Sequence, residues 1–292
     1  MSTQSIPSKL GPVFARCRDE GRSALIGYLP VGFPTVDESL TSFRTMVDAG
    51  CDIIEVGVPY SDPVMDGPTI QDAADQALTN GVRVRDVFTA VEAITSAGGN
   101  AVVMSYWNPV LKYGVENFAR DLAAAGGAGL ITPNLIPEEG AEWHEAADRH
   151  GLDRIYLVAP SSTTERIALT VDASRGFVYA ASTMGVTGAR DAVSDMAPEL
   201  CARVREYSDI PIGVGLGVRN REQAAQIASY ADGVIVGSAL VTAANAGQDR
   251  LASLVSELAE GVLSRRAAVG TGRSRDRRGG SRSTGRTSHP VG

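Results

Sequence analysis

The sequence lacks the features that mark a membrane, secreted or metal-binding protein. Its 292 residues contain three scattered cysteines and no CxxC pair, and an odd number argues against a disulfide framework and for a reducing compartment. No apolar run approaches the roughly 18 residues of a membrane span, and the N-terminus lacks a charged segment leading into an apolar one, as a secretory signal requires. We therefore expect a cytoplasmic protein that makes no membrane contact.

Common cofactor and nucleophile motifs are missing as well. The three histidines show no metal-ligand spacing, and the sequence has neither a P-loop nor a G-x-S-x-G elbow. Any catalysis is therefore expected to use carboxylates and backbone dipoles, without a metal or cofactor bound by this chain.

Charge divides the chain into two parts. The net charge is −7, yet eight arginines and one aspartate from Arg265 onward give that end a local charge of +7 and leave −14 on residues 1–264. Because residues 265–292 are mostly Arg, Gly, Ser and Thr, we predict a disordered tail after a single catalytic domain, 1–264. The acidic domain makes nucleic acid an unfavourable partner. Nucleic-acid binding or regulation by the Arg-rich tail alone stays open as an alternative.

Within that domain, apolar runs typical of covered parallel strands alternate with amphipathic stretches typical of helices. The eight expected strands are 24–29, 52–57, 101–106, 128–132, 154–159, 176–181, 211–215 and 233–237. Eight such units predict an α/β fold of the (β/α)8 TIM-barrel type, with an extra N-terminal helix covering its bottom. A doubly wound open sheet is the rival, but the first strand is not followed by a dinucleotide-binding glycine fingerprint.

The second expected strand carries the first candidate catalytic residue. Alternation along residues 52–57 places Glu55 on the interior face, because Ile54 and Val56 suit the helix layer. Lost hydration would raise the pKa of such a carboxyl group towards the range of a general acid or base. A glutamate held by backbone N–H groups is the structural alternative.

The loop after this strand is restricted by three prolines and carries Asp62 and Asp66. Asp66 stands just before an expected helix and can reach over the barrel mouth. A role as a turn former or helix cap is equally open for it. Tyr179 shares parity with Phe177, so it is expected to face the interior near Glu55 or, alternatively, to bond a backbone carbonyl within the core.

Glycine-rich loops follow the last two expected strands, at Gly213, Gly215 and Gly217 and at Gly237-Ser238. Glycines there let backbone N–H groups approach an anion, and a helix N-terminus adds a favourable dipole, so we predict a phosphate site. After the sixth strand, Thr187 and Gly188 lie in a loop of small residues that suits a mobile lid. A plain surface loop is the alternative.

Long segments of the chain resemble the tryptophan synthase alpha subunit family. They are EVGVPYSDPVMDGPTIQ (55–71), YLPVGFPT (28–35), SYWNPVLKYG (105–114), VYAASTMGVTGAR (178–190), GVGLGV (213–218) and DGVIVGSALV (232–241). The resemblance implies a TIM barrel that cleaves indole-3-glycerol phosphate to indole and glyceraldehyde 3-phosphate, and it covers residues 8–264.

The resemblance also implies a role for each matching residue. Glu55 matches the catalytic glutamate, Asp66 the aspartate that accepts the indole N–H, and Tyr179 a tyrosine beside the glutamate. The matching substrate-binding residues are Tyr28 and Tyr106 of the indole pocket, Thr187 and Gly188 of the lid, and Gly217, Gly237 and Ser238 of the phosphate site.

The family works as an α2β2 complex, so the resemblance implies a beta subunit that receives indole and holds pyridoxal phosphate. The expected contacts are the Pro63 loop, Trp107-Asn108-Pro109 and the region near Pro137. Asn134 departs from the aspartate usual in the family. A stand-alone lyase that releases free indole, a degenerate non-catalytic barrel and another phosphate-binding barrel enzyme are the alternatives.

Overall fold

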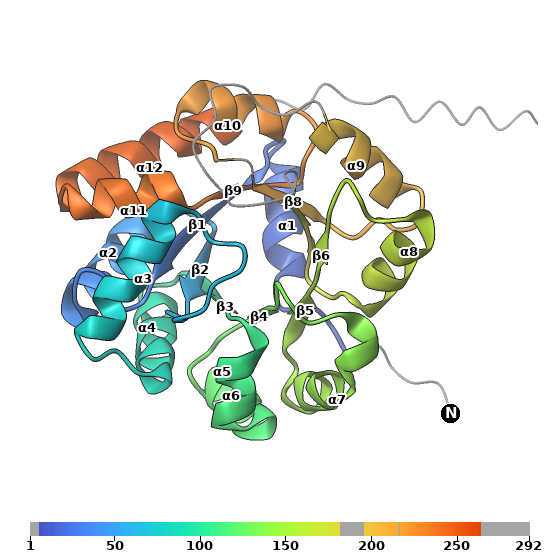
Figure 1. Cartoon of the computed structure of the whole chain (residues 1–292). Coiled ribbons are helices and arrows are strands. Elements are labelled where there is room, and N and C mark those ends of the chain that lie inside the picture. Colours follow the sequence, from blue (N-terminus) through green and yellow to red (C-terminus); the bar gives the residue numbers. More distant parts are fainter. Residues whose placement is uncertain (1–5, 182–195, 216, 264–292) are drawn as a thin grey trace, which may run out of the picture.

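The computed structural model describes residues 6–181, 196–215 and 217–263, in which parallel strands surrounded by helices form a barrel (Figure 1). Neighbouring strands follow the order β5-β4-β3-β2-β1-β9-β8-β7-β6. Their bounds are β1 Ala24–Pro30, β2 Ile53–Gly57, β3 Asn100–Met104, β4 Gly129–Ile131, β5 Asp153–Ile155, β6 Leu157–Val158, β7 Val178–Ala181, β8 Ile212–Gly215 and β9 Gly233–Val236.

The two ends of this sheet meet in one short stretch of chain. β5 pairs with β4 and β6 pairs with β7, while only Tyr156 separates β5 from β6. These two segments together occupy the place of the fifth expected strand, so the nearly closed barrel confirms the predicted (β/α)8 fold. Tyr156 is buried, and its hydroxyl lies 2.8 Å from Nε2 of His144 on the covering helix α7 (Ala141–His150).

Helices form the outer ring in the expected alternation with strands. The remaining helices of this ring are α2 Val36–Asp48, α3 Pro68–Thr79, α4 Val84–Ser96, α5 Trp107–Tyr113, α6 Val115–Ala124, the 3-10 turn η1 Pro137–Glu139, α8 Thr164–Ala173, α9 Met196–Arg205, α10 Arg221–Ala228, α11 Ser238–Asn245 and α12 Gln248–Val262. Several begin at residues that suit helix starts: Thr35 and Asn220 accept from backbone N–H groups as N-caps, and Pro68 opens α3.

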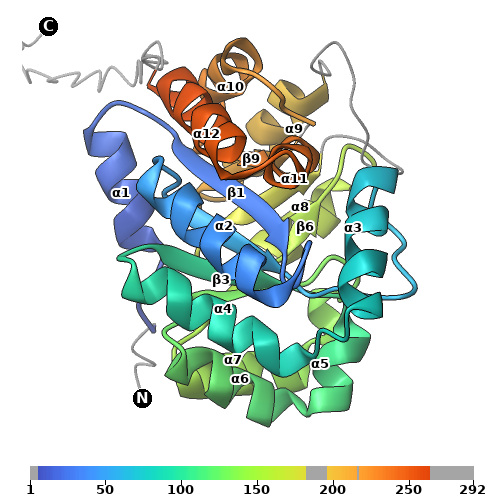
Figure 2. The same ribbon diagram turned by 90° about the vertical axis from the view of Figure 1, so that its left-hand side faces the viewer.

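The extra N-terminal helix, α1 (Gly11–Asp19), closes the bottom of the barrel, as predicted. In Figure 2 it lies at the end opposite α3 and α5. Its Phe14 ring contacts Phe177 inside the barrel, with ring centroids 5.6 Å apart. α1 therefore covers the N-terminal ends of the strands, and a site is expected at their C-terminal ends.

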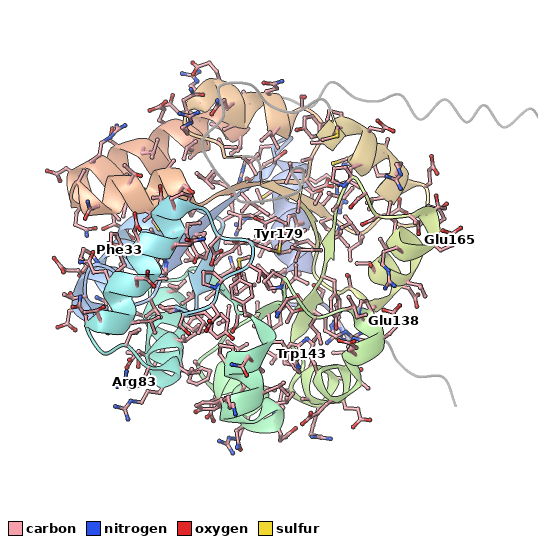
Figure 3. All side chains as sticks on the ribbon, viewed as in Figure 1. Phe33, Arg83, Glu138, Trp143, Glu165 and Tyr179 are labelled. Atoms are coloured by element: carbon pink, nitrogen blue, oxygen red, sulfur yellow. The ribbon has the colours of Figure 1, made fainter. Side chains whose placement is uncertain are left out.

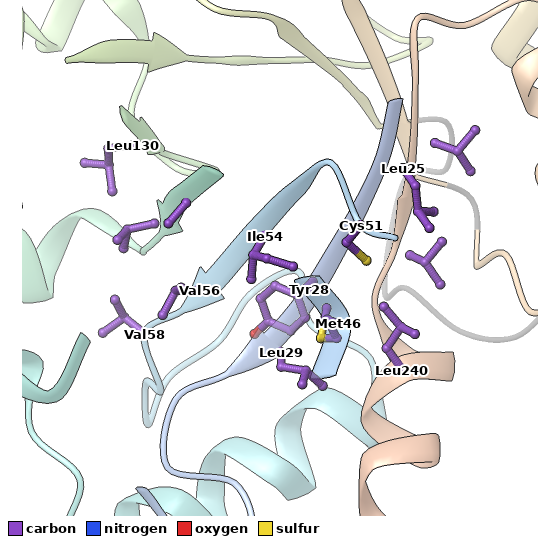
Figure 4. Packing of buried hydrophobic residues seen from close by; sticks show 14 of the residues in the cluster. Leu25, Tyr28, Leu29, Met46, Cys51, Ile54, Val56, Val58, Leu130 and Leu240 are labelled. Carbon is purple, nitrogen blue, oxygen red and sulfur yellow. The ribbon is translucent and has the colours of Figure 1, made fainter. Parts of the chain in front are cut away.

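Alternation along the strands separates two apolar layers. Ile53 and Phe177 belong to the inner layer with α1, whereas Ile54 and Val56 pack against the helices. Figure 4 shows part of this outer layer, in which Met46 of α2 lies close to the strands. The interior parity expected for Glu55 and Tyr179 follows from this arrangement.

A buried ion pair fixes the start of β2. The Asp52 carboxylate receives two N–H bonds from Arg22, at 2.7 and 2.8 Å, and one from the Leu25 backbone N–H at 2.9 Å. The Arg22 guanidinium and the Leu25 N–H hold the pKa of Asp52 below its usual value despite burial. The Asp52 side chain thus links the loop that carries Arg22 to the starts of β1 and β2.

Two sequence-based expectations concern other regions. The expected tail, 265–292, lies outside the described residues. Within the described ranges, every helix is too short or too polar to cross a lipid bilayer.

Candidate active site

Glu55 occupies the interior of the barrel near the C-terminal end of β2. It pairs in register with Tyr28 of β1 and Val102 of β3, and its side chain is 1% exposed. Neither carboxyl oxygen has a hydrogen-bond partner among the residues that the structure describes. Burial raises the pKa of Glu55 from 4.5 to about 8, so the group is poised to exchange a proton near neutral pH.

Two tyrosines stand beside Glu55 because glycines leave room for them. A Cβ atom on Gly57 would lie 2.4 Å from the Tyr28 hydroxyl, and one on Gly215 would lie 2.6 Å from the Tyr179 hydroxyl. Figure 3 shows Tyr179 near the centre of the barrel. Burial, together with the charges of Glu55 and Asp66, raises the pKa of both tyrosines well above the usual value. Both hydroxyls therefore remain protonated and able to donate.

Asp66 lies at the mouth, in the loop just before α3. Its carbonyl accepts a 2.7 Å bond from the Gln71 side chain. Burial raises the pKa of its carboxyl group, and hydrogen bonding with Tyr106 opposes that rise. Asp66 also shifts the pKa of Tyr28 and of Tyr179, so the expected carboxylates and tyrosines share one electrostatic environment.

Tyr106 connects the loops around the mouth. The strand expected at 101–106 ends at Met104, because Ser105 and Tyr106 turn into α5. The Tyr106 hydroxyl accepts the backbone N–H groups of Val64, at 3.2 Å, and Met65, at 3.0 Å. Its ring faces that of Tyr60, with centroids 5.3 Å apart. The predicted site residue Tyr106 therefore contacts the loop that carries Asp66.

Asn134 ties the next loop to this group. Its side-chain oxygen accepts the Trp107 backbone N–H at 2.9 Å. A carboxylate oxygen could accept the same bond, so the departure from aspartate leaves this contact possible. Three exposed apolar side chains lie close in sequence to the expected partner contacts: Val64 (69%) in the loop before α3, Leu111 (49%) on α5, which also holds Trp107-Asn108-Pro109, and Ile136 (44%) just before η1.

The expected phosphate-binding residues lie on adjacent strand ends. β8 and β9 pair in register, Gly217 follows β8 with a φ of 69° that favours glycine, and Gly237 caps α11 before Ser238. The helix dipole at this N-terminus favours an anion. Gly237 also lies beside the Tyr28 ring, since a Cβ atom there would be 3.6 Å from Tyr28. The expected lid residues Thr187 and Gly188 are outside the described residues.

Some interpretations of individual residues need revision. Gly213 lies too deep for the phosphate loop, because a Cβ atom there would be 3.0 Å from both Ile235 and the Phe177 ring. Sequence reasoning also missed Met104 and Leu157, which, like Tyr179, are partly buried and pack against the inner layer. Continuing the alternation along their strands would have placed both on the interior wall.

The site combines a buried glutamate whose neutral form is favoured, a second carboxyl group at the mouth, tyrosine hydroxyls and a helix N-terminus that favours an anion. Such a set can move protons on an aromatic substrate that is anchored by an anionic group. Within the described ranges, no group of three His, Cys, Asp or Glu residues is arranged to bind a metal ion.

Comparison with known proteins gives a consistent result. The sequence model of the tryptophan synthase alpha chain family matches residues 14–268. The tryptophan synthase alpha chain of Nocardia farcinica is 72% identical over 257 residues, covering 88% of this chain and 97% of that protein. The alpha chain of Mycobacterium tuberculosis (strain ATCC 25177 / H37Ra) is 70% identical over 259 residues, with 89% and 96% covered.

Solved structures show the same likeness. A structure of Mycobacterium tuberculosis tryptophan synthase matches with a TM-score of 0.86 and 68% identity, covering 88% of this chain and 99% of that one. A mutant tryptophan synthase alpha subunit from Pyrococcus furiosus matches with a TM-score of 0.75 and 33% identity, covering 82% and 98%.

Proposed function

Because this chain belongs to the tryptophan synthase alpha chain family and is a lyase of that type, we propose that Glu55 and Asp66 carry its chemistry. The reaction is the retro-aldol cleavage of indole-3-glycerol phosphate to indole and glyceraldehyde 3-phosphate. The observation that carries this assignment is the buried Glu55 carboxyl group, which has no hydrogen-bond partner among the described residues and whose pKa of about 8 lies close to neutral pH.

Glu55 acts first as an acid and then as a base. In its protonated form it gives a proton to C3 of the indole, which becomes a positively charged indolenine. The resulting carboxylate takes the proton of the glycerol hydroxyl next to the ring. The bond between that carbon and C3 then breaks, its electron pair restores the indole ring, and the hydroxyl carbon becomes the aldehyde. A carboxyl group with a pKa near neutrality can perform both steps.

Asp66 stabilises the charge that develops on the indole. Its carboxylate accepts the ring N–H, and it does so more strongly when the nitrogen is positive, which favours the transition state over bound substrate. Tyr28, Tyr106 and Tyr179 line the indole pocket. Met104 and Leu157 add an apolar wall to it.

The phosphate group anchors the other end of the substrate. We assign it to the backbone N–H groups at Gly217, Gly237 and Ser238, with Thr187 and Gly188 closing over it. This binding orients the reacting carbon without taking part in the reaction.

We further propose a beta subunit as partner, in an α2β2 complex that receives the indole. The exposed apolar residues Val64, Leu111 and Ile136 support this, because each is exposed and lies within a few residues in sequence of a segment where such a contact is expected. Because the reaction of this chain consists of proton transfer and carbon–carbon cleavage, no cofactor is assigned to it. Pyridoxal phosphate belongs to the beta partner.

The test is indole release from indole-3-glycerol phosphate by the purified chain, with and without a tryptophan synthase beta chain. We expect Glu55→Gln and Asp66→Asn each to lower the rate at least about 100-fold. Asp62→Asn is the matched control for the assay without the beta chain, because Asp62 is an exposed carboxylate of the same loop. Wild-type rates in the Glu55→Gln variant would refute the catalytic assignment.

The same assay separates the alternatives. Slow release that the beta chain accelerates supports the paired enzyme, whereas rapid release by the chain alone supports a stand-alone lyase. No release under either condition supports a degenerate barrel.

A further inference from the structure

The single 3-10 turn η1 lies where the beta partner is expected to bind. We call residues 136–140 the docking segment; it begins at the exposed Ile136 and leads into α7. The Glu139 N–H donates to the Ile136 carbonyl at 3.1 Å. The Gly140 N–H donates to the Pro137 carbonyl, also at 3.1 Å. One such turn has little stability of its own, so its shape depends on the residues beneath it.

Tyr156 supplies a rigid base for this segment. It stands between β5 and β6, where the barrel closes, and its side chain is buried in the apolar layer that faces the helices. Its backbone carbonyl accepts the Tyr179 N–H at 3.0 Å, so strand pairing fixes its position. Its hydroxyl lies 2.8 Å from Nε2 of the half-buried His144, and the two rings meet edge to face.

The docking segment rests directly on this hydrogen-bonded pair. A Cβ atom on Gly140 would lie 2.5 Å from the Tyr156 hydroxyl and 3.2 Å from Nε2 of His144, so a larger residue would displace the pair. The Gly140 carbonyl in turn accepts the His144 backbone N–H at 2.8 Å. Both members of the pair therefore contact the residue at which the docking segment ends.

The pair is uncharged at neutral pH and depends on both members. Burial lowers the pKa of His144 below its usual value and raises the pKa of Tyr156 to about 12. Phenol and imidazole can exchange donor and acceptor roles, so the bond forms in either tautomer of His144. Removing the imidazole takes this bond from a buried hydroxyl, which is costly in a protein interior.

We propose that the Tyr156–His144 pair is a brace that positions the docking segment for the beta partner. Both are positioning residues, because they contact the segment and not the substrate. Arg166 of α8 holds the segment from outside, with Nη1 2.7 Å from each carboxylate oxygen of Glu138. That ion pair is exposed and contributes little, so the buried pair sets the conformation. The inference rests on the proposed contact between the region near Pro137 and a beta subunit.

Tyr156→Phe tests the brace, because it keeps the ring and removes only the hydroxyl. Isothermal titration calorimetry with the tryptophan synthase beta chain of the indole assay measures Kd. We expect Kd to rise about 3- to 10-fold, the effect of one lost hydrogen bond. Indole release by the chain alone should stay within about twofold of wild type, because the brace lies outside the substrate pocket.

Substitutions of His144 test whether the two residues act as a pair. His144→Leu should raise Kd by a similar factor, and the double variant with Tyr156→Phe should bind no more weakly than either single variant. His144→Gln should keep most of the affinity, because its amide can still bond the hydroxyl.

His150→Leu is the matched control. His150 lies on the same helix, and its Nε2 also bonds one side chain, that of Glu116 at 2.8 Å, but at the opposite end of α7 from the docking segment. This variant should bind the beta chain with the wild-type Kd. Urea unfolding shows whether all the variants remain folded.

Hydrogen exchange provides a readout in the free chain. The amides of Gly140 and His144 should exchange faster in Tyr156→Phe than in wild type or in His150→Leu. Unchanged exchange at both amides would overturn the brace, whatever the activity of the chain.

The binding outcomes separate two kinds of failure. Wild-type Kd values in Tyr156→Phe and His144→Leu would overturn the positioning role and leave the proposed function intact. A beta chain that neither binds nor accelerates the wild-type chain would contradict the proposed partner and the brace together. A large fall in indole release by Tyr156→Phe alone would show that the pair supports the substrate pocket, and it would overturn the role in docking.

Discussion

Replacing Glu55 by Gln should make the folded chain more stable at neutral pH while removing its activity. Glutamine retains the size and shape of the side chain but cannot ionise. Wild-type Glu55 is fully enclosed, and no described residue bonds its oxygens. The folded state therefore tolerates the protonated form and opposes the ionised form.

The size of the effect follows from the two pKa values. Burial raises the pKa of Glu55 from 4.5 to about 8 on folding. Below pH 4.5 the group is protonated in both the folded and unfolded states, so its stabilising contribution is fully present. As pH rises from there to the folded pKa, the unfolded state binds fewer protons, and the folded state loses about 1.4 kcal/mol per pH unit.

At pH 7 the wild-type chain has thus lost about 3 kcal/mol, and above pH 8 the loss levels off near about 5 kcal/mol. Glu55→Gln avoids this loss. The free energy of unfolding of the variant should exceed that of wild type by an amount that grows with pH.

Urea unfolding of both proteins at several pH values between 5 and 8.5 measures this difference. Glu142→Gln, at an exposed position on α7, should change the free energy of unfolding little at any pH. A difference between Glu55→Gln and wild type that stays constant to within about 0.5 kcal/mol over this range would refute the reasoning, because one pH unit alone is worth more.

Activity should respond in the opposite direction. General acid–base groups raise the reaction rate roughly 100- to 10,000-fold, so the rate of indole release by Glu55→Gln should be lower than that of wild type by a factor in this range. The wild-type rate should decline above about pH 8, where the proton donor is lost. A substitution that stabilises the fold and abolishes catalysis would identify Glu55 as a functional group that lowers the stability of the folded chain.

Three further substitutions test other parts of the structure. Asp52→Asn weakens the buried pair with Arg22 and should lower the free energy of unfolding by about 2–4 kcal/mol in urea titrations, without changing kcat. Gly57→Ala places a methyl group against the Tyr28 ring; it should cost about 1–3 kcal/mol in the same titrations and lower kcat/KM, and Tyr28→Leu in the same chain should restore much of the stability. Ser238→Asp brings a negative charge to the predicted phosphate site, so steady-state kinetics should show KM for indole-3-glycerol phosphate rising at least about tenfold, with a smaller change in kcat.

The barrel and the position of Glu55 could be predicted from sequence because they depend on local periodicity. Apolar runs of strand length alternate with amphipathic helices, and a period of two assigns each strand residue to one face. The parity of Glu55, Tyr179 and Phe177 follows from that rule alone. The covering helix α1 is also visible as an amphipathic segment before the first strand.

Contacts between distant loops could not be predicted in this way. Tyr106 belonged to an expected strand, yet the chain turns at Ser105, and its hydroxyl meets Val64 and Met65 some 41 residues earlier in the chain. The break of the fifth strand at Tyr156, where the barrel closes, likewise depends on pairing with both neighbouring strands.

The sequence by itself thus determined the α/β barrel, its strand order along the chain and the residues that face its interior. Only the tertiary structure decided that the Tyr28 ring fills the space over Gly57, and that Glu55 is left without a partner among the described residues. The physical reason is that face and period are set by backbone geometry within one element. Side-chain proximity across elements depends on register and loop conformation, which many weak contacts settle together.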